Sequence, residues 1–228
     1  MLPPPALAAR FDVLTQEVCS SPWRWSLLAV RDTNRLLEAI TPEQFERDGR
    51  LPYWADLWAS APVLAGHLRG MSSLAGRDLL ELGCGLGLAG IAAAQAGATV
   101  LMTDYEDDAL EFARFNAAAN LGAGELSRVT FRRLDWRAAG SPGQFDMIVG
   151  ADIVYERANF EPILSLVRNC LRPSGTFIIT DPQREIGRDF IRTAEGGGFR
   201  ASGRSIPVTH RGRDMTVDLS EITRREDA

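Results

Sequence analysis

Apolar residues recur along most of the chain with two spacings, one typical of buried strands and one typical of helices. From residue 77 onward, short apolar runs such as "DLLEL" and "TVLM" alternate with longer segments whose apolar residues recur every three or four positions. Alternation of this kind predicts a parallel sheet with helices on both of its faces. The expected fold class is therefore α/β, with a Rossmann-like, doubly wound sheet.

The same pattern places the individual elements of this region. Strands are predicted at 78–83, 98–104, 128–136, 145–155 and 176–183, and helices at 88–97, 107–122 and 160–175. The tail, residues 198–225, reads as two strands joined by the turn-like "RGRD". The sheet should therefore have seven strands and end in an antiparallel hairpin.

The first fifty residues show a different pattern. "SLLAVRDTNRLLEAI", residues 26–40, has apolar residues at helical spacing, and "TPEQFERDG", residues 41–49, has Pro42 at a first helical position. A further helix is predicted at 60–68. We expect residues 1–50 to form an N-terminal helical cap and residues 51–228 to form the main domain.

Composition and charge exclude several classes of protein. The 228 residues are 45% hydrophobic and 24% charged, which is typical of a globular protein, and no apolar run reaches the ~20 residues that span a bilayer. The net charge of −5 argues against a general nucleic-acid binder. The start of the chain lacks the features of a signal peptide. These features predict a cytoplasmic protein, a monomer or weak oligomer, without nucleic-acid or membrane partners.

Cysteine and lysine usage narrows the possible chemistry. The three cysteines are far apart and form no CxxC pair, so neither a disulfide framework nor a metal site is expected. All 25 basic residues are arginine, which excludes catalysis by a lysine of this chain.

The stretch "LLELGCGLGLAG", residues 79–90, contains two overlapping glycine patterns. A dinucleotide-binding pattern would begin at Gly85, two residues too far from the end of the strand. The other pattern, Gly83, Gly85 and Gly87, begins directly after the strand and follows Glu81. An acid at this place suits a cationic ligand better than a pyrophosphate. S-adenosylmethionine carries an ammonium and a sulfonium and therefore fits.

Two further strand ends carry chemistry. Asp104 follows the next strand about 20 residues later, where a carboxylate can accept hydrogen bonds from both ribose hydroxyls. NAD enzymes use the same device, so Asp104 alone does not discriminate. Asp135 and Trp136 follow the third strand, where they can bind an adenine amine and border the adenine ring.

The motifs "ELGCGLG", "TD", "LDW" and "ADIVY", in this order and spacing, resemble the class I, seven-stranded S-adenosylmethionine-dependent methyltransferases. The resemblance covers residues 52–223. "PYWADLWASAPVLAGHL" and "ADIVYE" are similar to the methyltransferase-16 family, whose members mostly methylate lysines of proteins. Within it, "LPYWADLW" is particularly similar to the subgroup that methylates the β-subunit of electron-transfer flavoprotein, and bacterial relatives are often labelled nicotinamide N-methyltransferase-like.

This resemblance implies roles for individual residues. The D-x-x-Y element corresponds to Asp152 and Tyr155, which are expected to act on the acceptor. The family's tryptophan corresponds to Trp58, which is expected to bind the cofactor or, alternatively, to line the lysine channel. Asp152 would orient the incoming amine or, alternatively, hold the methionine part of the cofactor. The further expected cofactor contacts adjoin the motifs and are Cys84, Tyr105 and Ala151.

Several residues admit both a structural and a functional interpretation. Trp54 could line the lysine channel or pack in the core, and Asp181 and Arg184 of "TDPQR" could touch substrate or form a plain turn. His67 and His210 are expected to be structural. Cys84 is expected to be tolerated for its small size rather than for redox chemistry.

Four functions remain possible from the sequence. The preferred one is a protein-lysine N-methyltransferase, and the next is a methyltransferase for a small, nicotinamide-like amine. A non-catalytic cofactor-binding protein and an NAD-dependent oxidoreductase are the other two.

Overall fold

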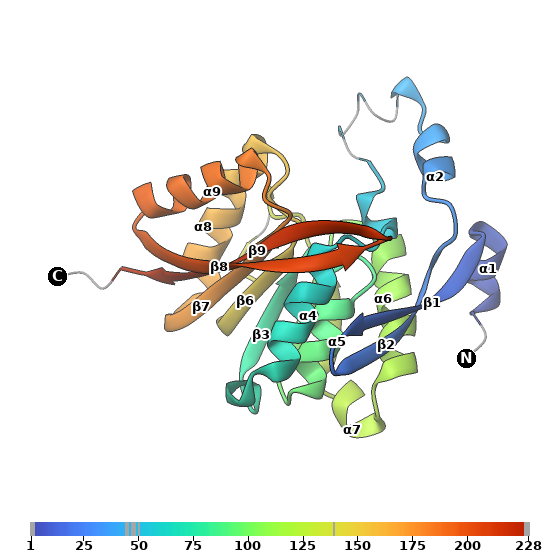
Figure 1. Cartoon of the computed structure of the whole chain (residues 1–228), viewed down its shortest axis with the longest axis horizontal. Helices are drawn as coiled ribbons and strands as arrows, with labels where there is room; N and C mark the ends of the chain where they lie inside the picture. Colours follow the sequence, from blue (N-terminus) through green and yellow to red (C-terminus); the bar gives the residue numbers. More distant parts are fainter. Residues whose placement is uncertain (1–2, 44–45, 47–48, 50, 139, 226–228) are drawn as a thin grey trace.

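A seven-stranded sheet forms the centre of the computed structural model, which describes residues 3–43, 46, 49, 51–138 and 140–225 (Figure 1). Its strand order is β5-β4-β3-β6-β7-β9-β8. Neighbouring strands from β5 to β7 are parallel, whereas β9 is antiparallel to both β7 and β8. The strands are β3 (Asp78–Leu82), β4 (Thr99–Asp104), β5 (Val129–Arg133), β6 (Phe145–Ala151), β7 (Leu171–Asp181), β8 (Phe199–His210) and β9 (Arg213–Arg224). The predicted mostly parallel sheet with a C-terminal antiparallel hairpin is confirmed.

Helices cover both faces of this sheet. One face carries α4 (Ser60–Gly70), α5 (Leu88–Gln95) and α6 (Asp107–Asn120), and the other carries α8 (Phe160–Cys170) and α9 (Glu185–Gly196) (Figure 1). Every residue of α5 except Gln95 is buried, because this apolar helix lies between α4, α6 and the sheet. The shorter helical segments are η1 (Tyr53–Ala55), η2 (Ser72–Leu74), α7 (Ala123–Leu126) and η3 (Arg157–Asn159).

Some boundaries differ from the predictions. Strand β6 ends at Ala151, so "DIVY" forms a loop after the strand and not the end of the strand itself. Strand β5 likewise ends at Arg133, before the "LDW" motif. The segment at 171–175, predicted to end a helix, instead begins β7, where Leu171 pairs with Phe145 of β6. Strand pairing therefore starts earlier on β7 than the apolar run at 176–180 indicates.

The N-terminal segment is a hairpin flanked by short helices. After α1 (Pro5–Arg10), β1 (Val13–Ser20) and β2 (Trp23–Val30) pair antiparallel, and α2 (Asn34–Glu38) follows. The predicted helix at 26–40 is therefore wrong up to Val30 and right only for its last part. The predicted helix at 41–49 includes residues 44–45 and 47–48, which lie outside the described residues.

Two asparagines of α6 explain why β2 is extended. The side-chain amide of Asn116 accepts a hydrogen bond from the backbone N–H of Leu28 at 2.7 Å and donates one to the carbonyl of Leu28 at 3.1 Å. Asn120 binds the N–H and the carbonyl of Ser26 in the same way, at 3.0 and 2.8 Å. These bonds satisfy backbone groups that a helix would pair internally. The hairpin shares a hydrophobic core with α5 and α6, and the division at residue 50 stays a prediction.

Among the described residues, no helix has the length and the apolar character that crossing a membrane requires.

Candidate functional site

A cavity of about 310 Å³ opens at the carboxyl ends of β3, β4, β5 and β6. Strands β3 and β6 are neighbours in the sheet, and the chain leaves β3 for α5 on one face and β6 for α8 on the other. Ligands of doubly wound sheets bind at such a switch point. The sequence-predicted site residues that line the cavity are Trp58, Glu81, Gly83, Cys84, Gly85, Asp104, Tyr105, Asp135, Trp136, Ala151, Asp152 and Tyr155. Gly87 does not line it.

The left-handed residues of the loop between β3 and α5 are the three glycines of the pattern that begins directly after the strand. Gly83, Gly85 and Gly87 have φ of +61°, +50° and +84°, all left-handed, whereas Gly90 lies inside α5. At Gly85 a Cβ would lie 3.0 Å from the carbonyl oxygen of Trp54, so the loop also requires glycine for space. Gly87 turns the chain into α5 and contacts Ala113 instead of the cavity.

Glu81 is a buried acid beneath this loop. Its Oε2 accepts a hydrogen bond from the backbone N–H of Gly90 at 3.0 Å, and a Cβ on Gly90 would lie 2.5 Å from the same oxygen. The pKa of Glu81 is raised to about 8, chiefly by burial and in part by the charge of Asp104, while the hydrogen bond from Gly90 acts in the opposite direction. Gly90 therefore permits the close approach that holds this carboxyl group.

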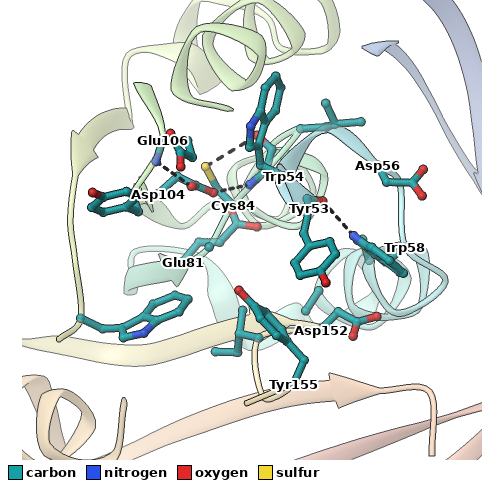
Figure 2. Close-up of a pocket in the computed structure, with 18 of the residues that line it drawn as sticks. Tyr53, Trp54, Asp56, Trp58, Glu81, Cys84, Asp104, Glu106, Asp152 and Tyr155 are labelled. Atoms are coloured by element: carbon teal, nitrogen blue, oxygen red, sulfur yellow. Dashed lines mark hydrogen bonds between the residues drawn. The ribbon is translucent and has the colours of Figure 1, made fainter. Parts of the chain in front are cut away.

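Asp104 links the glycine loop to the end of β4. Its Oδ2 accepts from the N–H of Gly85 at 2.9 Å, and its Oδ1 accepts from the N–H of Glu106 at 3.0 Å (Figure 2). Both bonds come from the backbone, so the carboxylate is fixed in direction. Tyr105 lies beside it, with the guanidinium of Arg133 4.9 Å from its ring centroid.

The "LDW" motif lies on the loop after β5. The Oδ1 of Asp135 accepts from the backbone N–H of Arg137 at 2.9 Å, and the indole N–H of Trp136 donates to Oδ1 of Asn159 at 3.2 Å. The bond to Asn159 fixes the plane of the indole at the cavity wall. Asn159, from η3, is a lining residue that the sequence reasoning missed.

Asp152 occupies an unusual position directly after β6. Its φ of +61° is left-handed, and its backbone N–H donates to the carbonyl of Thr180 at 2.9 Å. The carboxylate forms an ion pair with the guanidinium of Arg184, and its Oδ2 accepts from the hydroxyl of Ser60 at 3.2 Å. The side chain is 5% exposed. The predicted substrate-facing acid is thus already paired with a cation.

Three aromatic rings gather beside Asp152. The ring of Tyr53 meets those of Trp58 and Tyr155 edge to face, with centroids 5.9 and 5.4 Å apart, and the indole N–H of Trp58 donates to the carbonyl of Tyr53 at 2.9 Å. Figure 2 shows these rings on the side of the pocket opposite Asp104. Trp58 is 38% exposed, so one ring reaches the surface. The sequence reasoning missed Tyr53, although it quoted the "PYWADLW" segment that contains it.

The residues with two interpretations lie as follows. Trp54 lines the cavity and also packs against Phe11 and Phe112, so it has both a site position and a core position. His67 contacts Arg204 and Glu221 of the C-terminal hairpin, and His210 lies at the end of β8; neither lines the cavity. The thiol of Cys84 is buried, which raises its pKa well above the ordinary value.

No group of three or more His, Cys, Asp or Glu side chains suited to a metal ion occurs in the described part of the chain. The lining is strongly acidic. It contains seven carboxyl groups, from Asp56, Glu81, Asp104, Glu106, Asp135, Asp152 and Glu156, against the single guanidinium of Arg137 among the described lining residues. Such a wall favours cationic ligands over phosphates or carboxylates.

Comparison with known proteins agrees with this chemistry. Residues 45–196 match the model of the lysine methyltransferase family. The protein N-lysine methyltransferase METTL21A of Mus musculus is 40% identical over 126 residues, covering 53% of this chain and 57% of that protein. EEF1A lysine methyltransferase 3 of Mus musculus is 31% identical over 186 residues, covering 78% of this chain and 75% of that protein. The chain thus spans little more than half the length of the first of these relatives.

A solved structure shares the fold. The magnesium protoporphyrin IX methyltransferase of Synechocystis, crystallised with S-adenosylmethionine, superimposes with a TM-score of 0.58 and 21% identity. The match covers 86% of this chain and 98% of that one.

Proposed function

Because the chain belongs to the S-adenosylmethionine-dependent lysine methyltransferase family, we propose that it transfers a methyl group to the side-chain amine of a lysine in a protein. The observation that carries this proposal is the acidic lining of the cavity combined with aromatic rings at its rim. The two positive charges of the cofactor, an ammonium and a sulfonium, and the amine of the acceptor are all compatible with such a wall.

The residues of the glycine side fit the cofactor. The backbone of the loop after β3 and the carboxyl group of Glu81 would bind the methionine part, and Asp104 would accept from the ribose hydroxyls. Asp135 and Trp136 would border the adenine. When bound, S-adenosylmethionine supplies an electrophilic methyl group on a sulfonium.

The residues of the opposite side fit the acceptor. Tyr53, Trp58 and Tyr155 present ring faces and edges that can surround an alkylammonium group and exclude water from it. Asp152 lies beside these rings and would orient the amine through a hydrogen bond. Methyl transfer is an in-line displacement, so aligning and desolvating the amine are the main tasks of these residues.

Labelling in a lysate tests the proposal. The purified enzyme is incubated with S-adenosylmethionine carrying a labelled methyl group and with a cell lysate, and intact-mass analysis and peptide mapping locate the product. We expect label on a lysine of a protein band. The enzyme contains no lysine, so label on its own band would not be lysine methylation. Label confined to the low-molecular-weight fraction would instead establish the small-molecule alternative, and absence of label everywhere would contradict both.

The chain's location in the cytoplasm, its state as a monomer or weak oligomer, and its place in the electron-transfer-flavoprotein subgroup stay predictions from the sequence.

A further inference from the structure

Arg184 connects the two buried acids behind the acceptor side of the pocket. It precedes α9, and its backbone N–H donates to Oδ1 of Asp181 at 2.7 Å. Its guanidinium contacts Oδ2 of Asp181 through Nε at 3.0 Å and through Nη2 at 2.9 Å, and Nη2 also forms the ion pair with Asp152. One cation therefore holds carboxylates from the ends of β6 and β7.

The surroundings fix this arrangement. The side chains of Asp152 and Asp181 are 5% and 8% exposed. Helix α9 approaches Asp181 so closely that a Cβ on Gly187 would lie 2.7 Å from its Cγ. The hydroxyl of Ser60 binds the second oxygen of Asp152. The guanidinium has little freedom to leave without breaking several of these contacts.

The pairing answers a chemical difficulty in the proposed reaction. A lysine amine has an ordinary pKa of ~10.4 and must lose its proton before it can attack. A nearby carboxylate favours the charged ammonium and raises that pKa, typically by 1–3 units for a charge within ~4–6 Å. An unpaired Asp152 would therefore hold the acceptor in its unreactive form.

We propose that Arg184 is a positioning residue for methyl transfer, whose guanidinium offsets the charge of Asp152 so that this carboxylate orients the acceptor amine without keeping it protonated. This inference rests on the proposed function. An oxygen that accepts from Arg184 or Ser60 retains a second lone pair, so Asp152 can still accept a hydrogen bond from an amine N–H.

Other charged and titratable groups also surround the pair. Asp181 comes from β7, and its pKa is raised to about 6 by burial, with a further contribution from Asp218 of β9 and opposition from the N–H of Arg184 and the charge of Arg188. The elements around the pair also carry Glu185 at the start of α9, Tyr155 and Glu156 after β6, Tyr53 and Asp56 among the cavity-lining residues, and His67 farther along α4. Arg184 is the cation in ion-pair contact with Asp152.

The test compares Arg184→Met, which keeps an unbranched apolar stem but removes the charged guanidinium, with Arg184→Lys, which keeps the charge. Arg192→Met is the matched control, because Arg192 lies on α9, the helix that Arg184 precedes, and pairs with Asp189 outside the cavity. Thermal unfolding checks that each variant is folded. If Arg184→Met does not fold, Asp181→Asn loosens the same guanidinium and should act in the same direction with a smaller effect.

The first measurement is the pH dependence of kcat on the protein band that the wild-type enzyme labels. The pH profile of kcat reports groups in the enzyme–substrate complex, so Arg184→Met should move the midpoint of this profile up by about one pH unit. The profile of kcat/KM reports the free lysine, and its midpoint should stay in place. Arg184→Lys should largely restore the wild-type profile. A purely structural role would lower the rate at every pH without moving the midpoint.

The second measurement needs no acceptor. Sinefungin, a cofactor analogue with an amine in place of the sulfonium methyl group, is compared by calorimetry with S-adenosylhomocysteine, which carries no such amine. Arg184→Met should increase the preference for sinefungin about tenfold, because Asp152 would then attract its ammonium without compensation. Arg192→Met should leave the preference unchanged.

Unchanged sinefungin preference together with an unshifted kcat midpoint would overturn the inference. If no lysine is labelled by any variant, the proposed function fails, whereas the sinefungin comparison still decides the role of Arg184.

Discussion

The two sides of the pocket hold their carboxylates by different means. On the cofactor side, Glu81 and Asp104 accept hydrogen bonds from backbone N–H groups of the glycine loop, α5 and the segment after β4. On the acceptor side, Asp152 is held by the side chains of Ser60 and Arg184, which come from distant parts of the chain. Backbone donors cannot be exchanged by substitution, whereas side-chain donors can. Substitutions therefore leave the hydrogen-bond donors of the cofactor side in place, whereas a single substitution on the acceptor side can change the charge around Asp152.

The largest expected effect is on the acceptor side. Asp152→Asn keeps the size of the side chain and suits the left-handed backbone, since asparagine tolerates φ near +60°, but it removes the charge. We expect kcat to fall by about 10²–10³-fold, because the amine loses its orienting carboxylate, while the affinity for S-adenosylmethionine changes by less than about threefold. Steady-state kinetics and calorimetry measure the two effects separately.

Asp189→Asn is the control for this substitution. Asp189 is also a buried acid paired with two arginines, Arg157 and Arg192, but it does not line the cavity. Its variant should keep the wild-type kcat. Full activity in Asp152→Asn would show that the reaction does not need the charge of Asp152. A large loss of cofactor affinity with kcat preserved would assign Asp152 to the cofactor, and either result would contradict the role proposed for it on the acceptor side.

The second effect is on the cofactor side. Asp104→Asn should weaken binding of S-adenosylmethionine by about 10–100-fold, since hydrogen bonds to a charged acceptor contribute ~1.5–3 kcal/mol. Calorimetric titration measures the change. Asp107→Asn is the matched control, because Asp107 lies only three residues away with a side chain 71% exposed and outside the cavity. Equal affinities in the two variants would show that Asp104 does not bind the ribose.

The same difference explains what the sequence could predict. The hydrogen bonds of Glu81 and Asp104 to the glycine loop and α5 lie within the single unit β3-α5-β4, spanning 9 and 19 residues. Periodicity predicts this unit, and its strand ends therefore place these acids beside the loop. The partners of Asp152 are 92 residues upstream and 32 residues downstream, and no local pattern joins them. Arg184 stands out in "TDPQR", but its contact with Asp152 cannot be predicted from that motif, because the contact depends on how β6 and β7 pair.

The N-terminal hairpin shows the same limit in the fold. The sheet was predicted from apolar runs that are buried by their immediate neighbours. Strand β2 has an apolar spacing compatible with a helix, and what makes it extended is the pairing with β1 and the side chains of Asn116 and Asn120, about 90 residues away. Long-range hydrogen bonds of this kind override local periodicity and leave no signal in a single sequence.

The smallest effect separates two ways in which Glu81 could serve the cofactor. Because its pKa is raised to about 8, this carboxyl group is largely protonated at pH 7 before the cofactor binds. If it pairs with the cofactor ammonium, its pKa falls and binding releases close to one proton at pH 7. The release should decline as the pH rises through 8, because the group is then already ionised before binding. Calorimetry in two buffers of different ionisation enthalpy counts the protons.

Glu81→Gln keeps an oxygen for the N–H of Gly90 and should abolish the release with only a several-fold loss of affinity. If the wild-type protein releases no proton, Glu81 stays neutral and only supports the glycine loop. The cofactor side would then present less negative charge than its number of carboxyl groups suggests, as the acceptor side does where Arg184 offsets the charge of Asp152.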